Sequence, residues 1–171
     1  MFCETMTDAS MTNRQSSFPL GPVLLAGSIA PLAVAFASQY LGGLQPCELC
    51  IWQRWGYGAA IAIALVSLVL PGPWRRLGAM LTALALLVVA GLALLHVGVE
   101  QHWWQGLASC SGNLNFNQSL ADLEKQVMET PVIPCDRPAW TMFGISMAGY
   151  DFAYALALGL FSLVAAIRSP G

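Results

Sequence analysis

Four apolar stretches, each long enough to cross a bilayer, constrain the fold of this chain more than any other feature. A membrane-spanning helix needs about 20 predominantly apolar residues. The stretches cover residues 20–42, 51–70, 77–99 and 144–167. Only 9% of the 171 residues are charged, whereas an average soluble domain carries roughly 25%. We therefore predict an all-α fold, a four-transmembrane-helix bundle, with residues 1–171 forming a single integral membrane domain.

The polar segments between these stretches predict how the chain is oriented. Residues 43–50 and 100–143 form two outer loops, of which the second is long. Four basic residues border the spans on the opposite side: Arg14, Arg75, Arg76 and Arg168. Basic residues near span ends favour the cytoplasm, so we expect both termini to be cytoplasmic. A cleaved signal peptide at the first stretch is the alternative, although that stretch exceeds the usual about 7–15 apolar residues.

The long outer loop is expected to carry a short amphipathic helix. Ser119 and Asp122 fit a capping box, and Leu120, Leu123 and Val127 recur at helical spacing. Such a helix could lie on the membrane surface or pack over the bundle. The net charge of −2 gives no reason to expect a nucleic-acid partner.

The five cysteines divide into one tail cysteine, Cys3, and four that fall in the outer loops, Cys47, Cys50, Cys110 and Cys135. Disulfides persist outside the cytoplasm, so two structural disulfides are one interpretation. A Cys110–Cys135 bridge would close a long loop, but a Cys47–Cys50 bridge closes almost none. The C-x-x-C spacing instead favours reversible thiol–disulfide chemistry. A zinc site built from the four thiolates is the weaker alternative.

The C-x-x-C motif is expected to open the second helix. Pro46 precedes Cys47, and proline is favoured in the first helical turn. The helix dipole there stabilises a thiolate. Arg54 follows Cys50 by four residues, on the same helix face, and a charge in this position is costly unless it is paired or faces a polar cavity. Arg54 could simply reach the interface, or it could stabilise charge that develops on a bound acceptor.

The segment from Pro46 to Trp55 (PCELCIWQRW), at the start of the second of four spans, resembles the disulfide bond formation protein B family. The similarity extends to the separated pair Cys110 and Cys135, and to residues 140–147 before the last span. Members of that family are membrane quinone reductases that reoxidise a periplasmic thioredoxin-like disulfide donor. The resemblance implies a bacterial inner-membrane location, periplasmic redox loops, a DsbA-like partner and a ubiquinone or menaquinone cofactor.

The resemblance also implies a role for each cysteine of the outer loops. Cys110 and Cys135 would form the disulfide offered to the partner, with Cys110 attacked first. Cys135 would then be released and could pair with Cys47. Cys50 would face the quinone ring, and Arg54 would hold the quinone. No metal is expected at this site.

Several residues have no secure counterpart in the family pattern. Glu48 places a carboxylate inside the C-x-x-C motif and could disfavour a thiolate. His96 is a candidate for quinone binding, whereas His102 is expected to be an interfacial residue. Asp151 near the start of the fourth span is most simply explained by the helix dipole.

Two other protein classes share some of these features. A vitamin K epoxide reductase-type protein also uses C-x-x-C in a four-helix membrane bundle, but the motif lies in a later span there. A membrane scaffold with two structural disulfides would be no enzyme at all, and its disulfides would resist mild reductant.

Overall fold

The computed structural model describes residues 20–70, 73–106 and 133–168. Four long helices run lengthwise: α1 (Leu20–Tyr40), α2 (Glu48–Val69), α3 (Pro73–Glu100) and α5 (Met147–Arg168). Two short strands, β1 (Thr141–Met142) and β2 (Ile145–Ser146), precede α5. The expected amphipathic helix around Ser119–Val127 and the cysteine Cys110 lie outside the described residues.

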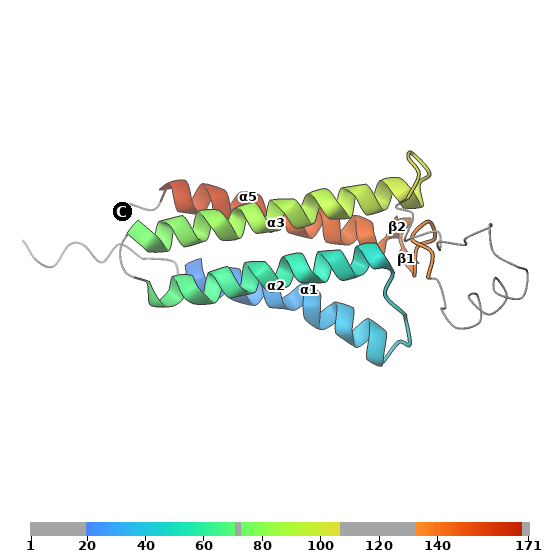
Figure 1. Cartoon of the computed structure of the whole chain (residues 1–171), viewed down its shortest axis with the longest axis horizontal. Helices are drawn as coiled ribbons and strands as arrows, with labels where there is room; N and C mark the ends of the chain where they lie inside the picture. The colour runs from blue at the N-terminus through green and yellow to red at the C-terminus, as the bar shows by residue number, and fades with distance from the viewer. Residues whose placement is uncertain (1–19, 71–72, 107–132, 169–171) are drawn as a thin grey trace, which may run out of the picture.

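All four helices are long and apolar enough to cross a membrane. They lie side by side, and α1 begins at the same end of the bundle at which α5 ends (Figure 1). The described chain is therefore all-α apart from one small hairpin, consistent with the predicted four-transmembrane-helix bundle. Leu86, Val89 and Ala155 are among the residues that form its buried core.

Helix α3 makes the most extensive contacts, packing against both α5 and α2, while α1 packs mainly against α2. Small residues allow these close approaches. A Cβ atom at Gly56 would lie 2.4 Å from the Val89 side chain, which is too close for the present spacing of α2 and α3. Ser162 of α5 donates a 3.0 Å hydrogen bond to the carbonyl of Ala79 in α3. Helix contacts in membranes depend on this kind of packing and hydrogen bonding, because lipid is as apolar as the helix surfaces.

Helix α1 bends away from α2 in its second half (Figure 1). Pro31 lies inside this helix, and an internal proline removes a backbone hydrogen bond and kinks a helix. The bend separates the carboxyl-terminal half of α1 from the bundle at the end where α2 begins. Arg54 of α2 spans this separation and contacts Gln39 and Ala35 of α1.

The hairpin was not predicted from the sequence, which placed the start of the fourth span at residue 144. β1 and β2 pair in antiparallel fashion through Thr141–Ser146 and Met142–Ile145. The two turn residues, Phe143 and Gly144, have φ values of 52° and 79°. Positive φ at both central positions is the geometry of a type I′ turn, which suits the twist of a two-residue hairpin. Met147 therefore begins α5.

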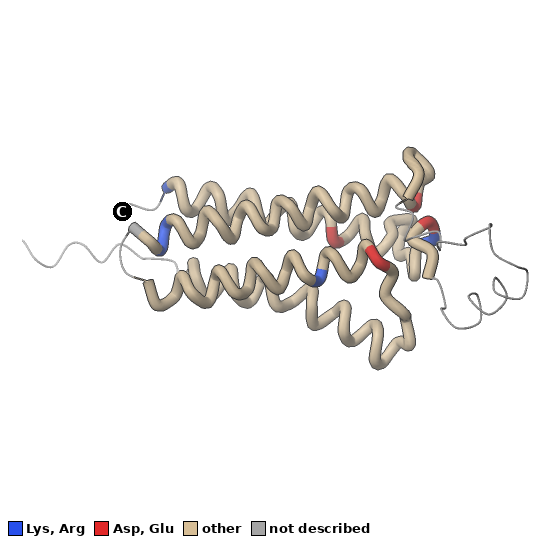
Figure 2. Tube along the Cα trace, in the orientation of Figure 1, with Lys and Arg blue, Asp and Glu red and all other residues tan. Residues whose placement is uncertain are grey.

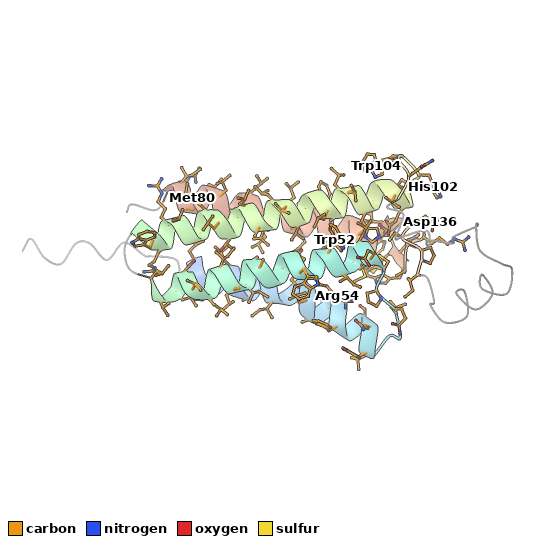
Figure 3. All side chains as sticks on the ribbon, viewed as in Figure 1. Trp52, Arg54, Met80, His102, Trp104 and Asp136 are labelled. Atoms are coloured by element: carbon orange, nitrogen blue, oxygen red, sulfur yellow. The ribbon has the colours of Figure 1, made fainter. Side chains whose placement is uncertain are left out.

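Charged residues are separated along the bundle (Figure 2). Basic residues lie at the end where α3 begins and α5 ends, and also within α2 and near the hairpin, whereas the acidic residues lie in the half of the bundle toward the hairpin. Figure 3 shows Trp104, His102 and Asp136 at the hairpin end and Met80 at the opposite end. The chemistry-bearing side chains described next are all in the half of the bundle nearer the hairpin.

Candidate functional site

The C-x-x-C motif forms the N-terminus of α2. Cys47 has extended backbone angles and caps the helix: its Sγ accepts a 3.4 Å hydrogen bond from the backbone N–H of Cys50. The expectation that Pro46 lies in the first helical turn is wrong, because the helix begins at Glu48 and the proline precedes the cap. The motif still opens α2, so Cys47 lies where unpaired backbone N–H groups favour an anion.

The two sulfurs of the motif lie 3.0 Å apart, and both are free thiols. Cys47 is buried and Cys50 is partly buried. The hydrogen bond with Cys50 lowers the pKa of Cys47 from 9.0 to about 4, burial acts in the opposite direction, and His96 lowers it further. The thiolate form of Cys47 is therefore favoured, and the thiolate is the reactive form in thiol–disulfide exchange.

His96 of α3 lies directly against this thiolate. Its Nε2 is 3.6 Å from the Cys47 Sγ and 3.7 Å from Oε1 of Glu100. Its Nδ1 is 3.2 Å from the side-chain nitrogen of Gln53. If the Gln53 amide donates to Nδ1, the imidazole proton is on Nε2, which faces Cys47 and Glu100. His96, expected at a quinone site, therefore contacts the first cysteine of the motif and can stabilise its negative charge.

Arg54 extends from α2 toward the displaced half of α1 (Figure 3). Its guanidinium donates hydrogen bonds to the Gln39 side chain and to the carbonyl of Ala35, 3.2 Å away. The guanidinium also lies 5.1 Å from the ring centre of Phe36. Nε of Arg54 is buried without a hydrogen-bond partner among the described residues. The charge is thus held inside the bundle between two helices.

A cavity of about 350 Å³ connects these groups. Its volume is in the range of pockets that hold small organic ligands, roughly 300–1,000 Å³. Most of its wall is apolar and comes from α1, α2, α5 and residues 133–139. The polar and sulfur-bearing side chains that line it are Cys47, Cys50, Gln53, Arg54, Tyr57, His96, Glu100 and Asp151, among others.

Cys135, in the segment that precedes the hairpin, packs against the C-x-x-C motif. It is 1% exposed and belongs to the same buried cluster as Cys47, Leu49 and Val99. Cys135 is disulfide-bonded, whereas Cys47 and Cys50 are not. The position of Cys110 relative to the cavity lies outside the described residues.

Several polar cavity residues were not assigned to the site from the sequence, among them Gln53, Tyr57, Glu100 and Asp151. Tyr57 donates a 2.7 Å hydrogen bond to Oδ1 of Asp151. Asp151 is not in the first turn of α5, so compensation of the helix dipole does not explain it. The available signal was the occurrence of polar residues inside apolar stretches, which marks functional positions in membrane proteins.

Cys47, Cys50 and His96 are also close enough together to be considered as metal ligands. Two thiolates bound to one zinc ion at about 2.3 Å in tetrahedral geometry would lie about 3.8 Å apart. The observed 3.0 Å separation of the sulfurs is shorter. This geometry suits a pair that forms and breaks a disulfide better than a pair that holds zinc.

The comparisons with known proteins agree with this chemistry. The family model described as "Disulfide bond formation protein DsbB" matches residues 19–165. A disulfide bond formation protein B from Xanthomonas axonopodis pv. citri is 30% identical over 160 residues, covering 90% of this chain and 91% of its own. A protein of the same name from Marinobacter nauticus is 31% identical, covering 78% of this chain and 83% of its own.

A further relative is an uncharacterized protein, RP370, from Rickettsia prowazekii. It is 29% identical to this chain over 147 residues and is covered over 83% of its length. No solved structure matches the chain. The family model covers most of the chain, including the C-x-x-C motif and the four long helices. The chain therefore belongs to the disulfide bond formation protein B family of disulfide-forming oxidoreductases.

Proposed function

We propose that this protein oxidises a periplasmic thioredoxin-like dithiol protein, of the DsbA-like type, and passes the two electrons to a membrane quinone. The observation that carries the proposal is the cavity itself. A free cysteine pair, an arginine and a histidine line one largely apolar pocket of ligand size between apolar helices. A quinone is an apolar ring with two hydrogen-bond acceptors, and such a pocket complements it.

The proposed reaction begins at the loop disulfide formed by Cys110 and Cys135. A thiolate of the partner attacks Cys110 and releases Cys135, and the second partner thiol then releases Cys110 and leaves the partner oxidised. The Cys135 thiolate attacks Cys47 of the Cys47–Cys50 disulfide and releases Cys50 as a thiolate. The contact between Cys135 and Cys47 in one buried cluster supports this transfer, since exchange requires the sulfurs to meet.

Cys50 then delivers the electrons to the quinone. Cys110 attacks Cys135 of the Cys47–Cys135 bond, which restores the loop disulfide and releases Cys47. As the Cys47–Cys50 disulfide then re-forms, the pair would supply two electrons to a quinone held in the cavity, which would take up two protons and leave as quinol. Arg54 binds a quinone oxygen and stabilises the negative charge that develops there. A DsbA-type donor is strongly oxidising, at about −120 mV, so its reoxidation needs an acceptor of higher potential, which a quinone supplies.

The proposed orientation places the hairpin end of the bundle at the periplasmic face of the bacterial inner membrane. The basic residues Arg75, Arg76 and Arg168 lie at the other end of the helices, where the positive-inside rule places the cytoplasm. Both termini are then cytoplasmic, the helices contact lipid, and residues 1–171 act as one integral membrane unit. Electrons enter from the periplasm and leave in the bilayer.

Quinone reduction by the purified protein in detergent, driven by a reduced DsbA-like protein, tests this function. Ubiquinone and menaquinone analogues are tried separately. Wild type is expected to turn over, Cys50→Ser and Cys110→Ser to be inactive, and the tail variant Cys3→Ser to match wild type. A folded wild type that reduces neither quinone, with disulfides that resist mild reductant, would contradict the proposal and favour a structural scaffold.

A further inference from the structure

Besides the cysteine pair and His96, a hydrogen-bonded pair of polar side chains lines the cavity. The hydroxyl of Tyr57, from α2, donates a 2.7 Å hydrogen bond to Oδ1 of Asp151, from α5. Tyr57 is 2% exposed, and both residues line the cavity. The second oxygen of Asp151, Oδ2, is buried and has no hydrogen-bond partner among the described residues.

Structural stabilisation does not account for this carboxyl group. A carboxyl group within a membrane-spanning helix opposes insertion, and an average interhelical hydrogen bond returns less than that penalty. Helix α3 packs against both α2 and α5, and the apolar core around Leu86 and Ala155 already joins the three helices. An intramembrane acid that faces a ligand-sized cavity is therefore better explained by chemistry performed there.

The hydrogen bond fixes which oxygen of the acid can act. Tyr57 donates to Oδ1, so the proton of the neutral acid is carried by Oδ2. A carboxyl group with a single donor in a water-poor site favours its neutral form, because an isolated buried charge is far more costly. Asp151 thus carries an O–H group that has no acceptor in the described protein, on a side chain that lines the cavity.

We propose that Asp151 is the acid that protonates a quinone oxygen during reduction, with Tyr57 as the residue that positions it. This inference rests on the proposed function. The cysteine pair gives up two electrons as its disulfide forms, and the quinone needs these electrons and two protons to become quinol. Oδ2 of Asp151 gives one proton to the reduced ring oxygen and is reprotonated by the proton that the Cys50 thiol loses, and solvent supplies the second proton.

The return of that proton has a suitable carrier. His96 of α3 contacts the Cys47 sulfur at 3.6 Å and lines the same cavity as Asp151. Tyr154, one turn further along α5, is the other titratable group that interacts with this pair, but its hydroxyl donates to the carbonyl of Gly27 at 2.9 Å. Tyr154 is therefore engaged with α1 and does not line the cavity.

The test compares Asp151→Asn and Tyr57→Phe with Tyr154→Phe as the matched control. Asn keeps the oxygen that accepts from Tyr57 but has no acidic proton. Three quantities are measured: kcat and KM for quinone reduction, the solvent deuterium isotope effect on kcat, and the rate at which the loop disulfide exchanges with the reduced donor.

Loss of a positioned general acid lowers rates by about 10²–10⁴-fold. We expect Asp151→Asn to lower kcat in that range, with KM changed by less than about threefold and donor exchange unchanged. Tyr57→Phe should lower kcat by a smaller factor and change the isotope effect, and Tyr154→Phe should match wild type in all three measurements.

Two results would overturn the inference: a kcat for Asp151→Asn within about threefold of wild type, or a loss that is equal in quinone reduction and donor exchange. If Asp151→Asn does not fold, Tyr57→Phe decides, and an unchanged kcat and isotope effect in that variant refutes the role. Failure of the wild type to reduce any quinone would instead refute the proposed function itself.

Discussion

Replacement of His96 by glutamine is expected to change the pH dependence of the cysteine pair. The imidazole Nε2 lies 3.6 Å from the Cys47 sulfur, and His96 contributes both a hydrogen bond and charge to the lowered pKa of that thiol. Glutamine removes the imidazole while it keeps a polar side chain of similar length. The pKa of Cys47 should therefore rise from about 4 toward its ordinary value of 9.0.

The predicted loss of reactivity of the cysteine pair in His96→Gln depends strongly on pH. A return to 9.0 is the upper limit, because the hydrogen bond from Cys50 remains. At pH 5 such a rise lowers the thiolate fraction by about 10⁴, while the more basic sulfur becomes about 10²–10²·⁵ more nucleophilic, given a Brønsted coefficient of about 0.4–0.5. The net loss at pH 5 is then at most about 30–100-fold. At pH 7 the two effects nearly cancel.

The assay follows reaction of the reduced pair with a small aromatic disulfide across the pH range. A background in which Cys3, Cys110 and Cys135 are serine leaves Cys47 and Cys50 as the reacting thiols. The exposed residue His102 gives the matched control, His102→Gln, which should reproduce the wild-type profile. An identical pH profile in His96→Gln and wild type would refute the assignment of His96 as the residue that stabilises the Cys47 thiolate.

Other predictions concern binding, electron flow and stability. Arg54→Met should lower kcat/KM for quinone by about 10–100-fold, since a hydrogen bond to a charged group is worth about 1.5–3 kcal/mol; an unchanged value would exclude Arg54 from the quinone site. Cys110→Ser should abolish oxidation of the protein donor but retain quinone reduction driven by dithiothreitol, and loss of both would contradict the separation of the two cysteine pairs. Phe143→Asn should slow amide hydrogen exchange in the hairpin about fivefold, because Asn-Gly suits a type I′ turn better; faster exchange would be the wrong sign. Ser162→Ala should lower the free energy of unfolding in detergent by about 0.6 kcal/mol through loss of its bond to Ala79, and no change would show that the bond is not stabilising.

The sequence predicted the helices well because their signal is local. A run of about 20 apolar residues identifies a span without knowledge of its neighbours. Boundaries were less certain where polar or turn residues adjoin the run: α2 begins at Glu48 rather than Ile51, and α3 at Pro73 rather than Leu77. The hairpin was missed because its second strand, Ile145–Ser146, lies inside the stretch predicted as the fourth span, so that stretch was not read as a turn and a strand.

The contacts that build the site join residues far apart in the chain. The sequence could predict candidate residues for the site but not which of them touch. Cys47 and Cys50 were identified by spacing, and Arg54 by its position four residues later. The contact of Cys47 with His96 joins residues 49 positions apart, and that of Tyr57 with Asp151 joins residues 94 positions apart. Such pairs depend on which helices are neighbours and how each is rotated, which apolar periodicity alone does not determine in a lipid-exposed bundle.

The most direct test of the account is a single-turnover experiment. Protein reduced at all cysteines is freed of reductant and mixed in a stopped-flow spectrophotometer with one equivalent of quinone, without any donor. The account predicts one quinol per chain, formed together with a Cys47–Cys50 disulfide that mass spectrometry identifies, and no quinol from Cys50→Ser. Quinol formation at the same rate and yield in Cys50→Ser would contradict the claim that this cysteine pair delivers its electrons to a quinone in the cavity.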